Sequence, residues 1–408
     1  LLLCRRITAA ALTPAKVAAV LAGLVALNFA MPLAYDCLPE GVIDPAENQG
    51  SFLSMWFDSG STMLYCMPHI KSKDHYLRNF ESIQPRLHVS IHGVSHPPGA
   101  SLALYWVGKP FGATGSIGND RLSYALGMTL FATLSVLAIY LLGRSLFASN
   151  EIGLMSAALW AVKPATLVYN TFAPDTIYVI FDILCLAFSW RVVTAAKRPW
   201  FSMITLSLLF YILAMLNFNW PVFVALFGAF LLLYARRQAW QPAEWLWRGA
   251  IPVLLGGGLL LWTCRAYHLH YINIFRYALA YAHQFYDFHA LYPWTIALLG
   301  SPIDLGILSG SFCACIFWRH FHSQLRQPML TPAILFLLVI LAFYLAAILG
   351  LNLKMESSRI WAWVVAVPLV IVANALRNSE HPRFYFLMAV ALSMLQYYGM
   401  RLFLWSAG

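Results

Sequence analysis

The sequence predicts an all-α polytopic integral membrane protein, and three observations lead to this fold class. Hydrophobic residues make up 61% and charged residues 10% of the 408 residues, whereas soluble domains have about 45–50% and about 25%. The apolar residues form long runs separated by polar links, and basic residues concentrate in every second link. This composition excludes a disordered chain, a coiled coil and a disulfide scaffold.

About eleven apolar stretches approach the roughly 20 residues that a transmembrane helix needs. They lie at 17–34, 122–142, 152–171, 174–190, 201–217, 219–235, 247–266, 303–318, 331–351, 360–376 and 384–404. The first is interpreted as a span because no small-residue cleavage site of a signal sequence follows it. Very short links at Phe172 and Phe218 predict two tight helical hairpins.

The charges predict the orientation of these spans. With the N-terminus inside, 14 of the 26 basic residues fall on the inner side, against only three acids, Glu151, Glu244 and Glu380. The outer side carries 12 basic residues and 12 of the 16 acids. Since short cytoplasmic loops are enriched in Lys and Arg, this distribution favours the N-terminus inside and the C-terminus outside. The net charge of +10 therefore reflects topology, and we expect no nucleic-acid partner.

Residues 1–408 read as a single transmembrane domain with two long outer segments. The first outside loop, 35–121, contains two apolar stretches, 52–67 and 100–111, that are too short to span and resemble interfacial helices. The second, 267–302, is aromatic and rich in histidine at its start. Long ordered loops are more often functional than short connections are. A disulfide between Cys37 and Cys66 is open if this side faces an oxidising compartment.

Polar residues that can carry chemistry gather on the outer side. His88, His92 and His96 are spaced four apart, but Gly93 and the prolines after His96 disfavour one continuous helix, so we expect no metal site from them. Asp182 lies two turns from Asp175 within a span; a structural role is its first interpretation, and a role toward a substrate or proton is the alternative. Lys354, Glu356 and Arg359 are either an interfacial anchor or a cationic cradle for phosphate.

The run His96-Pro97-Pro98-Gly99 after a long first outside loop resembles the polyprenyl-phosphate-dependent glycosyltransferases of the GT-C superfamily. The bacterial protein-mannosyltransferase and aminoarabinose-transferase types are the most similar in layout. Pro174-Asp175 at the start of a span also fits this family, as does the stretch from Lys354 to Trp361, which is similar to a late Glu-x-x-Arg-x-Trp motif. The resemblance covers most of the chain in layout and about 20 residues in motif.

The resemblance implies an inverting transfer of a sugar from a polyprenyl phosphate, with an acid of the first outside loop as general base. Asp36 fits best by position, and Asp58 and Asp74 are rivals. The remaining site residues would bind substrate or phosphate: His96, Lys163, Asp175, Lys354, Glu356 and Arg359. No cofactor is certain, although a divalent cation is an open option. No Gly-rich phosphate loop is present, which agrees with a donor that is not a nucleotide.

Two other functions remain as alternatives, a transporter or flippase and a catalytically silent subunit of a membrane complex. A transporter predicts matching halves with interrupted helices, and no convincing internal repeat is visible. By the resemblance, the partners are membrane lipids, the polyprenyl-phosphate sugar and a glycan, lipid or protein acceptor. The location is the bacterial inner membrane with the active site outward. The sugar, the acceptor, the lipid length and the oligomeric state stay open.

Overall fold

A computed structural model describes residues 12–36, 62–87, 91–115, 120–165, 175–288, 302–303, 305–307, 309–327, 329–351 and 362–406. Within these ranges the chain consists of helices and the turns that join them, with no strand. The predicted all-α class is confirmed.

Helical structure occupies each of the apolar ranges that the sequence predicts. In chain order the helices are α2 (Pro14–Asp36), α7 (Arg121–Thr133), α8 (Ser135–Phe147), α9 (Asn150–Val162), α11 (Thr176–Thr194), α12 (Trp200–Leu216), α13 (Trp220–Arg237), α14 (Pro242–Tyr267), α17 (Ser311–Leu325), α18 (Pro332–Leu351), η4 (Ala362–Val365), α20 (Ala366–Arg377) and α21 (Pro382–Ser406). Among the described residues, five segments are long and apolar enough to cross a membrane: residues 14–33 of α2, α7 with α8, α11, α13 and α14. The chain is thus an all-α protein of membrane type.

Two predicted spans are interrupted in ways that the hydropathy does not reveal. The stretch around 122–142 is divided at Leu134, where the amide donates to the carbonyl of Phe131 instead of continuing the α-helical pattern. The prediction of one helix over 303–318 is wrong, because α17 begins only at Ser311. Gly310 has a φ of 100°, a backbone conformation that an L-residue rarely adopts and that ends a helix.

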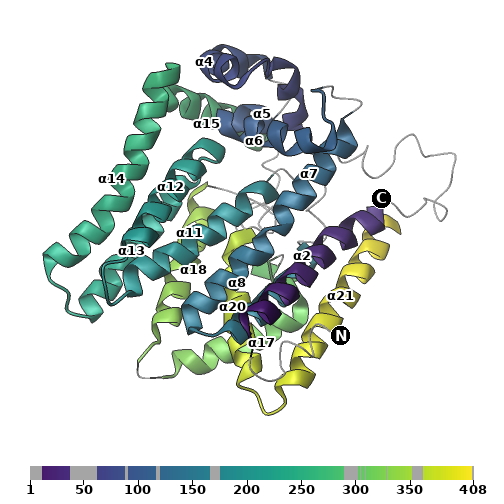
Figure 1. Cartoon of the computed structure of the whole chain (residues 1–408), viewed down its shortest axis with the longest axis vertical. Helices are drawn as coiled ribbons and strands as arrows, with labels where there is room; N and C mark the ends of the chain where they lie inside the picture. Colours follow the sequence, from purple (N-terminus) through teal and green to yellow (C-terminus); the bar gives the residue numbers. More distant parts are fainter. Residues whose placement is uncertain are drawn as a thin grey trace.

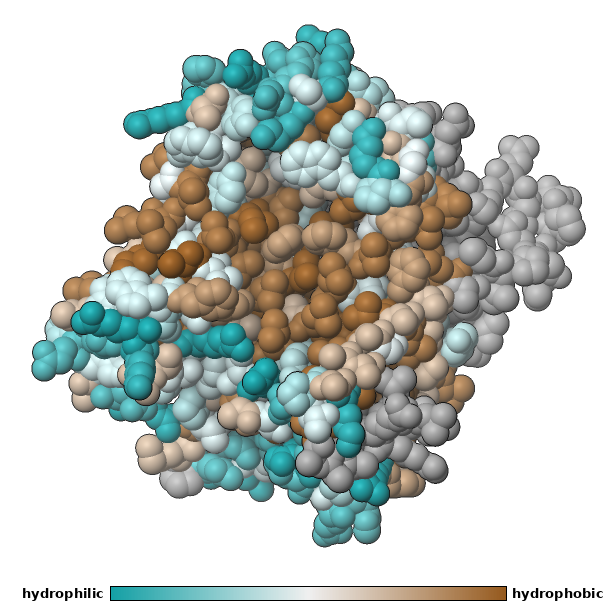
Figure 2. Space-filling model, in the orientation of Figure 1, coloured by the Kyte–Doolittle hydropathy of each residue, from teal (hydrophilic) through white to brown (hydrophobic). Residues whose placement is uncertain are grey.

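A hydrophobic band crosses the middle of the molecule between two hydrophilic ends (Figure 2). Helix α14 contributes large exposed apolar side chains to the surface, with Leu254 71%, Leu261 65% and Trp262 67% exposed. Exposing such large apolar side chains to water would be unfavourable. Exposure of this extent along one helix face is therefore expected for residues that contact lipid. The apolar surface therefore agrees with a protein embedded in a bilayer.

Shorter helices form a cap over one end of the bundle (Figure 1). They are η1 (Thr62–His69), α4 (Lys73–Ile83), η2 (Gln84–Leu87), α5 (Ile91–Ser95), α6 (Pro98–Gly108), η3 (Lys109–Phe111) and α15 (Tyr271–Phe288). Helix α6 with η3 covers the predicted stretch 100–111, and its interfacial position stays a prediction. Of the predicted stretch 52–67, the part from Thr62 is a 3₁₀ helix and the rest lies outside the described residues.

The cap has a hydrophobic core of its own, which is distinct from the core of the bundle. Met63, Tyr76, Phe80 and Leu104 are buried in it, and Tyr178 of α11 joins it from the bundle. Cys66 is a free thiol in this core, and its burial raises the pKa of the thiol to about 11. The thiol is therefore protonated at neutral pH and unreactive. Its proposed partner Cys37 lies outside the described residues.

The opposite end of the bundle carries the links that the sequence predicts to be cytoplasmic. Arg377 donates to Glu151 at 2.8 Å, which joins the end of α20 to the start of α9. Arg237 donates to the carbonyl oxygen of Leu330, which joins the end of α13 to the link before α18. These contacts hold basic links that are far apart in sequence at the same end of the bundle. This is expected if successive helices cross the bundle in opposite directions, because every second link then lies at the same end.

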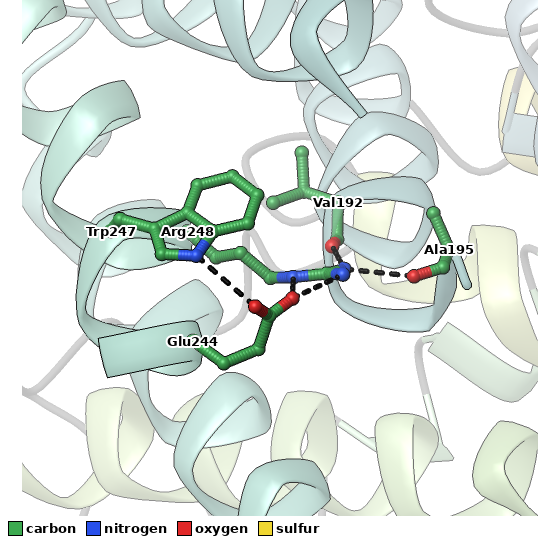
Figure 3. A network of polar contacts seen from close by, with 5 residues as sticks. All are labelled: Val192, Ala195, Glu244, Trp247 and Arg248. Atoms are coloured by element: carbon green, nitrogen blue, oxygen red, sulfur yellow. Dashed lines mark hydrogen bonds and ion pairs between the residues drawn. The ribbon is translucent and has the colours of Figure 1, made fainter. Parts of the chain in front are cut away.

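A buried arginine closes this end around the last turn of α11 (Figure 3). Arg248 of α14 is 2% exposed and donates to the carbonyl oxygens of Val192 and Ala195 at 2.7 and 2.9 Å. Its guanidinium also bonds Glu244, with Nη2 at 2.7 Å and Nε at 2.8 Å from Oε1. The charge is thereby neutralised, and the carbonyls that a helix end leaves without partners are satisfied.

We predict that Arg248→Met lowers the free energy of unfolding by about 2–3 kcal/mol, because buried carbonyls lose a charged donor. Glu244→Gln should cost only about 0.5 kcal/mol, since the Glu244 carboxylate is partly hydrated and an exposed ion pair contributes little. Denaturant titration of the purified protein in detergent micelles measures both values. Equal losses in the two variants would show that Arg248 stabilises the fold mainly through Glu244 and not through the carbonyls.

Candidate functional site

An ion pair between His96 and Asp175 lies where the cap meets the bundle. The Nε2 atom of His96 is 3.6 Å from Oδ1 of Asp175, and the two side chains are 13% and 10% exposed. The Nδ1 atom of His96 lies 3.2 Å from the hydroxyl oxygen of Ser95. The imidazole is therefore held between an acid and a hydroxyl, in a position shielded from bulk water.

Local sequence rules place both members of this pair. Helix α5 ends at Ser95, and Pro97 is extended, with ψ of 160°, as the N-cap of α6. Pro98 then starts α6, a position where the missing amide hydrogen costs nothing. Asp175 is the N-cap residue of α11, where the helix dipole favours a negative charge. His96 thus lies just before the N-cap of α6, and Asp175 is the N-cap of α11.

Gly99 explains why α6 comes so close to the bundle. A Cβ atom at this position would overlap the main-chain carbonyl of Met215 at the end of α12. Only glycine permits this approach, because the obstacle is backbone and cannot move aside. The glycine of His96-Pro97-Pro98-Gly99 therefore determines the distance between the cap and α12.

Aromatic side chains complete the surroundings of His96. The ring of Tyr178, one turn along α11 from Asp175, has its centroid 5.7 Å from that of His96. The hydroxyl of Tyr178 points to the sulfur of Met63 at 4.0 Å, within the core of the cap. His96 therefore has an apolar wall on this side, which strengthens its electrostatic interaction with Asp175.

Lys163 is a second charged group buried near the same end of the bundle. It caps the C-terminus of α9, is 2% exposed and places Nζ 3.8 Å from the ring centroid of Trp160. Trp160 donates to the hydroxyl of Ser135 at 2.7 Å, which holds the ring in position. Within the described ranges, no acidic side chain forms an ion pair with Lys163.

The register of α9 and α20 gives the level of Lys163 in the bundle. The two helices pack together and are antiparallel, and Glu151 faces Arg377 at the basic end. Twelve residues further along α9, or about 18 Å at 1.5 Å per residue, the chain reaches Lys163, while the same distance along α20 reaches Val365. Val365 ends η4, so Lys163 lies level with the helical turn that follows the predicted phosphate cradle.

An apolar groove of about 570 Å³ opens between α17, α18 and α20. Its walls include Ile303, Phe317, Trp318, Tyr344 and Pro368. The residues from α17 and α18 belong mainly to the halves of these helices nearer the cap, and those from α20 follow directly on η4. The groove therefore offers an apolar surface between these helices that can accept an alkyl chain.

Several predicted site residues lie apart from this pair or outside the described part of the chain. Asp74 lies in the first turn of α4, with its side chain 64% exposed and 3.9 Å from the ammonium of Lys73. Asp36 is the last residue of α2, and only its backbone is described. The others fall outside the described residues: Asp58, Lys354, Glu356 and Arg359.

The histidine run does not form one helical face. Helix α5 spans only Ile91–Ser95, so it contains His92 but ends before His96, and His88 lies outside the described residues. Among the residues that are described, no group of three or more His, Cys, Asp or Glu side chains is placed to hold a metal ion. His96 instead pairs with an acid that is 79 positions later in the chain, a contact that no spacing rule reveals.

No protein-family model matches the chain, and no curated protein sequence matches it closely enough to show a relationship.

We predict that Gly99→Ala destabilises the protein by about 1–3 kcal/mol, because an added methyl group forces α6 away from α12. Gly258→Ala in α14 is the matched control, since a Cβ there meets nothing within 4 Å and alanine favours the helix by about 1 kcal/mol. Thermal unfolding in detergent distinguishes the two. A Gly99→Ala variant as stable as the wild type would refute the close approach.

Proposed function

We propose that the protein is an integral membrane glycosyltransferase that moves a sugar from a polyprenyl phosphate to an acceptor on the outer face of the bacterial inner membrane. The observation that carries this proposal is the shielded His96–Asp175 pair, which links His-Pro-Pro-Gly to Pro-Asp at the end of the bundle covered by the cap. These are two of the motifs on which the resemblance to the GT-C superfamily depends. The pair supports their membership of one site.

The proposed reaction inverts the anomeric carbon in one displacement. A carboxylate of the first outside loop accepts the proton of the acceptor hydroxyl while the hydroxyl oxygen attacks the anomeric carbon. The bond between this carbon and the phosphate oxygen breaks, and the phosphate leaves with the electron pair. Asp36 is the leading base, with Asp58 and Asp74 as alternatives.

The leaving phosphate gains negative charge, so cations and donors held near it stabilise the transition state. We assign this role to His96, oriented by Asp175, and to Lys163, together with Lys354 and Arg359. We assign to Glu356, three positions before Arg359 in the sequence, the role of orienting this arginine. Lys163 is buried beside the Trp160 ring and forms no ion pair within the described residues, and we assign its amine as a donor to the phosphate.

The lipid portion of the donor requires an apolar surface that is open to the bilayer. The groove between α17, α18 and α20 supports this requirement, since its lining is almost entirely apolar. Residues of η4 and α20 line the groove, and they come soon after the segment proposed to bind the phosphate in the sequence. A chain anchored there would keep its phosphate at the outer end of the bundle.

Eleven spans with the N-terminus inside complete the proposal. The ion pairs of the basic end and the cap at the other end support a chain that crosses the bundle with each successive helix. Nucleotide sugars are cytoplasmic, whereas the proposed site faces outward, so a lipid-borne donor fits this topology.

We expect Asp36→Asn to reduce sugar transfer by about 10²–10⁴-fold, because the acceptor loses its general base. Asp58→Asn and Asp74→Asn should stay within a few-fold of wild type. The measurement is release of radiolabelled sugar from polyprenyl-phosphate sugars by purified protein in lipid. Glu81→Gln is a control for a cap acid remote from the pair, as Glu81 bonds His270 at 2.9 Å.

The same assay separates the alternatives. If every acid variant matches wild type, the carboxylate mechanism is wrong. If no donor is consumed but a solute crosses liposomes that contain the protein, the chain is a transporter. His96→Gln should raise KM for the donor more than it lowers kcat, since the pair binds phosphate in the ground state as well.

The topology makes a separate prediction about two exposed lysines. In a background without exposed cysteines, Lys71→Cys should react with an impermeant maleimide from outside intact cells, because the cap lies on the outer face. Lys197→Cys, in the link between α11 and α12, should react only after the membrane is opened. The reverse pattern would invert the proposed orientation.

A further inference from the structure

Helix α15 presents an exposed apolar stripe that the proposed reaction does not use. Ile272, Phe275 and Leu279 are 65%, 41% and 43% exposed. At 100° per residue they fall within about 60° of one another around the helix axis. A stripe of this kind on a soluble surface would be unfavourable, so it indicates a partner that is apolar.

The other two faces of α15 are different. Ile274 and Ala278 are 1% and 3% exposed, and Ile274 belongs to the hydrophobic core of the cap. Tyr271 donates to the carbonyl of Ala214 at 2.7 Å, and Gln84 donates to the carbonyl of Ile274 at 3.2 Å. The third face carries the exposed residues Asn273 and Arg276, together with Ala280 and Tyr277. One face is thus fixed to the protein, one is apolar and exposed, and one carries the exposed polar residues.

The apolar stripe continues a surface that already faces lipid. Helix α15 begins four residues after α14 ends, and the last large exposed apolar residue of α14 is Trp262, 67% exposed and less than two turns from its end. Tryptophan is enriched at the level of the lipid headgroups. The stripe of α15 therefore starts at the edge of the hydrophobic band, on the side of the cap.

We infer that α15 is an interfacial helix that rests its Ile272–Phe275–Leu279 stripe on the outer leaflet of the bilayer, with Arg276 at the level of the lipid phosphates. A helix with an apolar face toward the acyl chains and a basic residue beside it has the composition that binds such an interface. The inference needs the membrane character of the chain, its choice of leaflet rests on the proposed orientation, and it is independent of the sugar-transfer reaction. It assigns α15 the role of holding the cap against the lipid surface.

Nitroxide scanning tests this inference in nanodiscs of phosphatidylethanolamine and phosphatidylglycerol. In a background with Cys4, Cys37, Cys264 and Cys315 replaced by serine, single labels are placed at Phe275→Cys and Leu279→Cys. Asn273→Cys on the polar face of the same helix is the matched control. Labels on the stripe should collide with oxygen more often than with a water-soluble nickel chelate, and the control label should show the reverse.

Two results would overturn the inference. If the stripe labels collide freely with the nickel chelate, the stripe faces water. If both reagents are excluded from the stripe but not from Asn273→Cys, then protein covers it, either another segment of this chain or a second copy. Equal far-UV circular dichroism of the labelled variants and wild type ensures that the fold is intact in each sample.

Discussion

Water is excluded from the hydrophobic band, and every polar group of the chain there must find its partner within the protein. Long helices meet this demand for their own amides, but their ends and interruptions do not. Two helix ends receive a specific side-chain donor: the Arg248 guanidinium donates to the last carbonyls of α11, and Asn28 donates to the carbonyl of Ala161 at 2.7 Å near the end of α9. Where these partners lie determines which helix ends can meet, and hence where charged groups gather.

The two ends of the molecule use charge in different ways. At the basic end, arginines bond carbonyls and exposed acids, which fastens neighbouring links together. At the end with the cap, fewer charges are present among the described residues near the bundle, but His96, Asp175 and Lys163 are each nearly excluded from solvent. Charges in a poorly solvated place act on a ligand more strongly than exposed ones do. This difference supports the choice of the capped end for chemistry.

Much of the fold can be predicted from the sequence, because a span is recognised from the mean hydropathy of about 20 residues. That mean changes little with the identity of any single residue. The position of α12 or α20 could be predicted for that reason, whereas the interruptions at Leu134 and Gly310 could not, since they depend on packing against other helices. The helices of the cap are more difficult to predict from hydropathy. Helix α4 has few apolar residues, and α15 lies in a stretch with the composition of an aromatic loop, so only their amphipathic pattern indicates a helix. For the site, Pro-Pro and Pro-Asp indicated helix starts, but the pairing of His96 with Asp175 is a long-range contact that spacing does not encode.

Helix α11 has one end in the Arg248 cluster and the other end at Asp175. Its 19 residues form a rod about 28 Å long at 1.5 Å per residue, and no proline interrupts it. A rod held at its base transfers any rotation or axial slip to its tip, because its backbone hydrogen bonds resist bending. The position of Asp175 along the axis of α11 therefore depends on contacts at the opposite end of the bundle. By holding the C-terminal end of α11, Arg248 fixes how far the Asp175 carboxylate extends toward the cap.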